Sequence, residues 1–137
     1  MKELKFRAWS KKHNSYLKFK GIQYDDDKIV GVFVVYGTIA GIPNTICLDP
    51  EAVVVEQCTG LKDKNGKDIY EGDILGGIWE CGAILYCDKC KQLQFHLRGN
   101  ECTACSGDTS WADVVEDDGN IEVIGNIHEN PDLLEER

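Results

Sequence analysis

Polar and apolar residues alternate along the start of the chain with the period of two that is typical of a β-strand. In KELKFRAW (residues 2–9), Leu4, Phe6 and Ala8 fall on one face, with polar and charged residues between them. Because successive side chains of a strand point to opposite faces, this pattern predicts a strand with one buried face. A similar alternation in KQLQFHLRG places a second apolar set on one face: Leu93, Phe95 and Leu97.

A turn at residues 13–14 separates the first strand from a second aromatic-containing segment. Trp9 and Tyr16 lie on either side of this turn, so we expect them to pair across a β-hairpin. Further along, residues 29–43 combine Val, Ile, Phe and Tyr with three glycines. Such residues favour strands over helices, and the glycines mark breaks between strands.

Helical patterns are scarce. Residues 108–110 offer capping side chains for a short helix over 111–117, and Pro131 is suited to the first turn of a second short helix. Many short strands separated by glycine turns predict a mainly-β fold. The pattern fits a barrel or a sandwich-like fold, and of these we expect a small β-barrel-like domain of short antiparallel strands with one or two short helices.

The composition is that of a soluble globular chain, with 42% hydrophobic and 28% charged residues in 137. No stretch approaches the roughly 20 apolar residues of a transmembrane helix. The N-terminus also lacks the apolar centre of a signal peptide, so we expect a cytoplasmic protein. We predict a single domain over 1–137, with N-terminal strands in 1–58 and a central hairpin and C-terminal β part in 59–137.

Acidic residues outnumber basic ones by 24 to 15, which gives a net charge of −9. Because non-specific nucleic-acid binding depends on Lys and Arg neutralising phosphates, this charge argues against it. Basic residues do gather in the first twenty positions, between the aromatic residues of the predicted strands. Alternation with charges on the solvent side is the simpler explanation, and a local nucleic-acid face is the alternative.

The densest motif is TGLKDKNGKDIYEGDI, residues 59–74. A calcium loop counted from Asp63 fails, because Gly66 falls at the fourth position and not at the sixth. A phosphate loop fails as well, because NGKD has no hydroxyl after its lysine. Asn65–Gly66 is instead a preferred pair for a two-residue type I′ hairpin turn. We therefore predict that this stretch is a structural hairpin and not a binding loop.

Three segments in order, KFRAW, TGLKDKNGKDIYEGDI and IEVIGNIHENPDLL, resemble the YopX-like family of bacteriophage and prophage proteins. The resemblance covers both ends and the centre of the chain. It implies a mainly-β, barrel-like fold and supplies no catalytic residues. The matching positions look like turn and packing residues: Thr59, Gly60, Asp63, Gly66, Tyr70, Gly72, Asp73, Gly125, Asn126, Asn130 and Pro131.

The chain departs from that family where cysteines accumulate, in a hairpin over 81–106. Two C-x2-C pairs, separated by eleven residues, offer four thiolates: Cys87, Cys90, Cys102 and Cys105. Paired knuckles of this kind are typical of a zinc ribbon, and four sulfur ligands leave no open position for water. We therefore predict a structural zinc site on a zinc-ribbon-like hairpin.

Other interpretations of the cysteines stay open. The four thiols could be incidental, a redox-active pair, or ligands of an iron–sulfur cluster. Cys81 and His96 are candidate substitute ligands. Cys47 and Cys58 lie in or near apolar strands and are expected to be buried thiols.

No set of nucleophile, base and orienting group can be assembled from the sequence. His13 and His128 lie in predicted turns, and the acidic runs 25–27 and 116–118 are typical of solvated turns. We therefore predict a non-enzymatic phage or prophage accessory protein in the bacterial cytoplasm. It would act as a protein-interaction module that binds a host or phage protein, and it could also form a homo-oligomer. The alternative is a nucleic-acid-associated protein that uses the basic N-terminal hairpin and the zinc ribbon.

Overall fold

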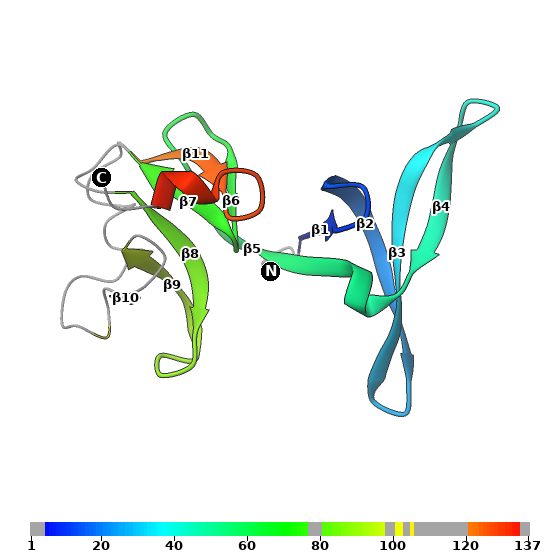
Figure 1. Cartoon of the computed structure of the whole chain (residues 1–137), viewed down its shortest axis with the longest axis horizontal. Coiled ribbons are helices and arrows are strands. Elements are labelled where there is room, and N and C mark those ends of the chain that lie inside the picture. The colour runs from blue at the N-terminus through cyan, green and yellow to red at the C-terminus, as the bar shows by residue number, and fades with distance from the viewer. Residues whose placement is uncertain (1–4, 77–80, 98–100, 103–104, 106–120, 135–137) are drawn as a thin grey trace. The chain divides into compact units, whose positions relative to one another are not determined.

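The structure, a computed structural model, describes residues 5–76, 81–97, 101–102, 105 and 121–134. Strands dominate these residues, as Figure 1 shows. The chain divides into two compact units, an N-terminal unit that ends at Gln57 and a C-terminal unit that begins at Cys58. Each unit is described by itself below, and the single-domain assignment over 1–137 stays a prediction.

The N-terminal unit holds the first five strands of a six-stranded antiparallel sheet with the order β4-β3-β2-β1-β5-β6, in which β6 is Asp68–Tyr70. A short 3-10 turn, Pro50–Ala52, leads into β5, whose first half belongs to this unit. Trp9 and Tyr16 are paired across the β1–β2 hairpin with their ring centroids 5.0 Å apart, which confirms that prediction. The strands are β1 Phe6–Ser10, β2 Ser15–Asp25, β3 Lys28–Ile39, β4 Ile42–Leu48 and β5 Val53–Lys62.

Two tight turns close the β2–β3 and β3–β4 hairpins of this sheet. At the first, Asp26 and Asp27 have φ of 48° and 66°; at the second, Ala40 and Gly41 have φ of 53° and 80°. Positive φ at both central residues is the requirement of a type I′ turn, whose twist matches that of the flanking strands. The buried core of this sheet is a small apolar cluster from β1, β3 and β5: Ala8, Val32, Val34 and Val53.

The C-terminal unit begins with the end of β5, which pairs with β6. A second antiparallel sheet follows, in the order β10-β9-β8-β7-β11, and a 3-10 turn at Pro131–Leu134 comes after it. The strands of this unit are β6 Asp68–Tyr70, β7 Asp73–Gly76, β8 Gly82–Cys87, β9 Gln92–Leu97, β10 Glu101–Cys102 and β11 Glu122–Asn126.

The core of the C-terminal unit lies on one face of β8 and β9. Ile84 and Phe95 face each other across these strands and are almost completely buried. Leu93 packs against the same cluster, as the alternation of β9 predicts. The cluster is made of Ile69, Leu75, Ile84, Phe95 and Ile121.

The mainly-β prediction is therefore confirmed, in the form of two antiparallel sheets. In the strands that the structure describes, the strand order of each sheet is linear and neither sheet closes on itself. The predicted helix over 111–117 lies outside the described residues. At the C-terminus, Pro131 begins a 3-10 turn where a short helix was expected. No helix in the described part of the chain is long and apolar enough to cross a membrane.

The prediction of a type I′ turn at Asn65–Gly66 was wrong. Gly66 has a φ of 81°, but Asn65 is not among the described residues with positive φ. The Gly66 N–H donates to the Asp63 carbonyl at 3.0 Å, and the Asp63 N–H donates to the Lys67 carbonyl at 2.9 Å. This pattern is that of a three-residue loop with glycine at the left-handed position. The physical reason is the Asp63 carboxylate, whose Oδ1 accepts from the backbone N–H groups of Asn65 and Lys67 at 2.9 Å.

Candidate metal centre

The β8–β9 hairpin forms the first half of the cysteine site. Cys87 is the last residue of β8, and Cys90 lies in the turn that follows. The Lys91 N–H donates to the Cys87 carbonyl at 2.8 Å, and Lys91 has a positive φ of 60°, which turns the chain back into β9. This tight turn holds the two cysteines of the first pair on the same side of the hairpin end.

Strand β10 supplies the second half. Cys102 lies opposite His96 in the β9–β10 ladder, and Cys87 lies opposite Gln92 in the β8–β9 ladder. Gln92 and His96 are four positions apart on β9 and so share a face. Cys87 and Cys102 therefore lie on the face opposite to the Phe95 side of the sheet.

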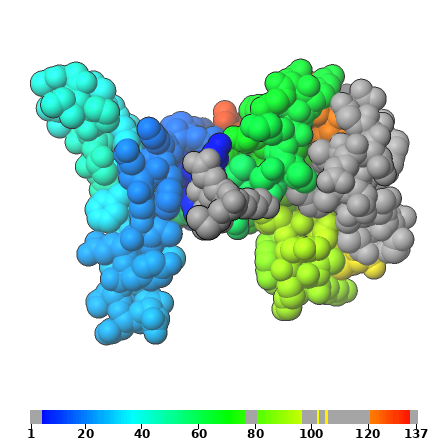
Figure 2. Space-filling view, turned by 180° about the vertical axis from the view of Figure 1, so that it is seen from behind, coloured from blue at the N-terminus to red at the C-terminus, as the bar shows by residue number. Residues whose placement is uncertain are grey.

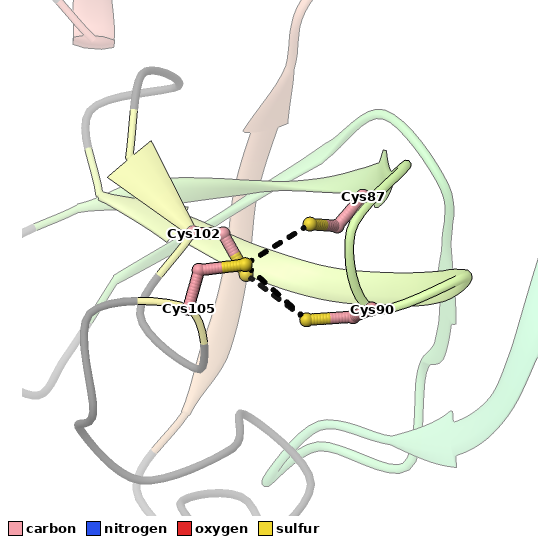
Figure 3. A group of neighbouring side chains, drawn as sticks. All are labelled: Cys87, Cys90, Cys102 and Cys105. Carbon is pink, nitrogen blue, oxygen red and sulfur yellow. Dashed lines mark hydrogen bonds between the residues drawn. The ribbon is translucent and has the colours of Figure 1, made fainter.

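The four sulfur atoms converge, as Figure 3 shows. Cys105 Sγ lies 3.4 Å from both Cys87 Sγ and Cys90 Sγ, and Cys90 Sγ lies 3.8 Å from Cys102 Sγ. All four atoms lie within 4.8 Å of one another. A tetrahedral zinc with bonds of about 2.3 Å to sulfur needs sulfur–sulfur edges of about 3.8 Å, so this spacing fits a metal.

The same distances exclude disulfides, because a disulfide bond is only about 2.05 Å long. All seven cysteines are free thiols. Cys87 and Cys102 are buried, whereas Cys90 is half-buried and Cys105 is exposed. Four protein sulfurs complete a tetrahedron, so a bound metal would have no position left for water or substrate.

Backbone and neighbouring thiols prepare Cys87 to act as a thiolate. The Cys90 N–H, the Cys105 thiol and the Lys89 N–H lower the pKa of Cys87 to about 6. The hydrogen bond with Cys87, followed by those with Cys90 and Cys102, raises the pKa of Cys105 to about 12. Four thiolates at this distance would repel one another, which also contributes to the raised pKa of Cys105, and a bound divalent cation would offset part of that repulsion.

The two substitute ligands considered from the sequence make other contacts. The Cys81 thiol donates to the Leu133 carbonyl at 3.1 Å. His96 is buried, and its Nδ1 lies 2.9 Å from the Gln94 carbonyl of the same strand. Within the described residues, the group that could hold a metal consists of the four predicted cysteines. Of the remaining thiols, Cys47 is exposed and Cys58 half-buried, so the prediction that they are buried was wrong.

The histidines considered for catalysis lie in structural turns. His13 Nδ1 is 2.7 Å from the Ser10 hydroxyl, and Ser10 is only 1% exposed. His13 also stacks near Tyr36, with ring centroids 4.2 Å apart. The His128 N–H donates to the Asn126 side chain at 3.0 Å within the C-terminal turn.

Sequence reasoning missed a buried polar cluster in the N-terminal unit. Glu56 is 2% exposed and accepts from Arg7 Nε at 2.9 Å and from the Tyr16 hydroxyl at 2.8 Å. The Arg7 guanidinium also lies 4.2 Å from the centre of the Tyr16 ring. The sequence held one indication of this cluster. Glu56 is the single charged residue in the apolar run VVVEQC, and a charge that is buried needs a partner.

Comparison with known proteins adds a family. The profile of the family described as YopX protein matches residues 5–135. The chain belongs to the YopX family. This agrees with the resemblance found in the sequence, and it covers both compact units. No curated protein matches the chain.

A solved structure supports the same fold. The crystal structure of protein EF1440 from Enterococcus faecalis is similar to this chain, with 28% identity and a TM-score of 0.66. The similarity covers 98% of this chain and 100% of that one. The two proteins therefore share a fold over nearly the whole of this chain.

Proposed function

We propose that this YopX family protein is a non-enzymatic accessory protein of a bacteriophage or prophage, built as a protein-interaction module with a structural zinc site. The observation that carries the zinc part is the convergence of four cysteine sulfurs within 4.8 Å. The phage setting follows from the family resemblance, and the bacterial cytoplasm is the compartment in which seven free thiols are maintained.

Zinc is the metal that best suits the site. Four soft thiolates in a tetrahedral arrangement select zinc or iron–sulfur chemistry over hard cations. An iron–sulfur cluster also takes four cysteines, but it encloses several atoms and spreads the sulfurs farther apart than a single metal does. Contacts of 3.4–3.8 Å between the sulfurs therefore favour one ion. The metal would tie the β8–β9 turn to β10, and the energy of binding would contribute directly to folding.

An interaction role is supported over nucleic-acid binding by the placement of the N-terminal aromatics. Stacking on exposed aromatic rings is a main source of affinity for single strands. Trp9 is 4% exposed, and Tyr16 donates to Glu56. Arg7, the arginine of this hairpin, forms an ion pair with Glu56 as well. Exposed lysines remain on β2 at Lys18 and Lys20, and Tyr24 at the end of the same strand is 62% exposed, so the support for the interaction role comes from Trp9, Tyr16 and Arg7 alone.

Metal analysis of freshly purified, reduced protein tests the zinc site. We expect about one zinc per chain that is retained through gel filtration and removed by a strong chelator. Less than about half an equivalent would contradict the site.

Two binding experiments separate the functional alternatives. If the protein is an interaction module, a pull-down from host extract should enrich one discrete protein. Retention on single- or double-stranded nucleic acid that weakens steeply with salt would instead support the alternative.

A further inference from the structure

The four sulfur ligands of the cysteine cluster differ in their access to solvent. Cys87 and Cys102 are buried, whereas Cys90 is half-buried and Cys105 is exposed. Part of the segment that carries Cys105 (yellow in Figure 2) is visible at the molecular surface beside the β8–β9 hairpin, with which β10 pairs. Because the oxidation of a thiolate depends on its exposure, the cluster has an accessible side and a protected side.

The two accessible cysteines are also direct neighbours. Cys105 Sγ lies 3.4 Å from Cys90 Sγ. A disulfide bond is about 2.05 Å long, so the two sulfur atoms would need to approach by about 1.4 Å. Cys90 lies in the turn between β8 and β9, and this approach needs no change in the strand ladder.

The buried Cys87 is a poorer partner for Cys105. Its Sγ also lies 3.4 Å from Cys105 Sγ, so distance alone does not separate it from Cys90. Cys87 is, however, the last residue of β8 and pairs with Gln92 in the ladder, and its carbonyl accepts from the Lys91 N–H at 2.8 Å. A movement of Cys87 would therefore disturb backbone hydrogen bonds that a movement of Cys90 leaves in place.

We propose that Cys90 and Cys105 are a peroxide-sensitive pair, which forms a disulfide when hydrogen peroxide oxidises the cluster and thereby releases the metal. This inference rests on the proposed zinc site and adds its regulation. A reducing compartment is compatible with such a pair, because cytosolic disulfides are usually transient and catalytic or redox-sensing.

The oxidation consumes one hydrogen peroxide and two cysteines. The Cys105 thiolate attacks one peroxide oxygen, so that an S–O bond forms, the O–O bond breaks and hydroxide leaves. The Cys90 thiolate then attacks the sulfur of the Cys105 sulfenic acid, the S–S bond forms, the S–O bond breaks and a second hydroxide leaves. Two protons from solvent convert both hydroxides to water. Each sulfur has then lost one electron, and these two electrons have reduced the peroxide.

The disulfide removes two of the four sulfur ligands. The two cysteines left behind, Cys87 and Cys102, cannot complete a tetrahedral site, so the affinity for zinc falls. The Cys90–Cys105 bond would still join the segment after β10 to the β8–β9 turn, which keeps the change local. A thiol reductant with zinc present should therefore restore the site.

Cys47 provides a contrast to the pair. It is exposed, as Cys105 is, but it is the single cysteine in the sequence of the N-terminal unit. An exposed thiol can be oxidised to a sulfenic acid, whereas a disulfide needs a second thiol close by. Oxidation at Cys47 should therefore leave the metal in place.

Zinc release from the reduced, zinc-loaded full-length chain after addition of hydrogen peroxide tests the proposal. We expect about one zinc per chain to pass to a chromogenic chelator. Mass spectrometry after blocking of the remaining thiols should show a disulfide between Cys90 and Cys105. Cys105→His keeps a metal ligand, since zinc also accepts three cysteines and one histidine, and it removes the disulfide. This variant should release zinc at least about tenfold more slowly. Cys47→Ser is the matched control and should release zinc at the wild-type rate.

Three results would overturn the switch: zinc that stays bound under peroxide, release with a different disulfide, or equal release rates from wild type and Cys105→His. If Cys105→His binds no zinc, Cys90→His replaces it, with the same expected effect. The disulfide found in the wild type decides the pairing in either case. Protein that keeps its zinc under peroxide contradicts only the switch, whereas reduced protein that holds no zinc before peroxide is added contradicts the zinc site itself. The two failures can therefore be told apart.

Discussion

Asp63 accepts a hydrogen bond from the backbone N–H of Val123 at 3.1 Å, across sixty positions of the chain. Its other carboxylate oxygen accepts from the N–H groups of Asn65 and Lys67. The Lys64 N–H also donates to the Ile121 carbonyl at 2.9 Å. The loop of the TGLKDKNGKDIYEGDI motif therefore ties the β5–β6 hairpin to β11, and its role is structural.

Asp63→Asn should destabilise the protein by about 2 kcal/mol, because the amide offers one acceptor in place of two and lacks the charge that strengthens these bonds. Asp68→Asn is the matched control. Asp68 binds Lys62 Nζ at 2.8 Å near the surface, and a pair of that kind contributes less than about 1 kcal/mol. Urea denaturation of both variants measures the difference, and equal losses would contradict the role assigned to Asp63.

The contribution of Asp63 should also depend on pH. Burial acts to raise the pKa of its carboxyl, but the N–H groups of Val123, Lys67 and Asn65 outweigh burial, and the pKa lies below the usual 3.8. A lowered folded pKa gives stability that is present above pH 3.8 and is lost as the pH falls through the folded value. The stability gap between wild type and Asp63→Asn should be constant from pH 7 to 5 and shrink below about pH 4. A gap that stays constant to pH 2.5 would argue against this assignment.

Gly125→Ala should disrupt the C-terminal turn. A Cβ at this position would lie 2.5 Å from Asn130 Oδ1, the atom that accepts from the Asn126 N–H. We expect a loss of about 2 kcal/mol, since either this bond or the bulge in β11 must move. Gly21→Ala is the control, because nothing lies within 4 Å of its Cβ position. Denaturant midpoints of the two variants should differ clearly, and similar midpoints would count against the packing described.

Cys87→Ser should remove the metal and loosen the β8–β9 hairpin. Replacing one of four thiolates by a hydroxyl weakens a structural zinc site, so we expect less than about 0.2 zinc per chain. Cys47→Ser is the control, because Cys47 is a free thiol in the N-terminal unit and outside the cluster. Metal content by mass spectrometry, together with the thermal unfolding temperature, should separate the two variants.

Local patterns explain most of what the sequence predicts correctly. Alternation places Phe95 in the core, and the turn after Trp9 pairs it with Tyr16. The C-x2-C spacing predicts the cysteine cluster because a single turn between Cys87 and Cys90 fixes each knuckle. These features depend on residues close in sequence.

Features that depend on distant residues were not predictable in the same way. Asn65–Gly66 has type I′ chemistry, but the Asp63 carboxylate imposes a three-residue loop and uses β11 as a further partner. The type I′ turns occur instead at Asp26–Asp27 and Ala40–Gly41. Glu56 accepts a hydrogen bond from Arg7, which lies forty-nine positions away in the sequence, and no local pattern identifies that pair.

X-ray absorption at the zinc edge of the purified, reduced protein tests the central claim most directly. We expect stoichiometric zinc surrounded by four sulfur atoms at about 2.3 Å, with no nitrogen or oxygen ligand. Serine variants at Cys90 or Cys105 should lower the sulfur count, whereas Cys47→Ser should leave the spectrum unchanged. A spectrum dominated by oxygen or nitrogen ligands, or protein that binds no zinc when refolded with it, would contradict the four-cysteine metal centre.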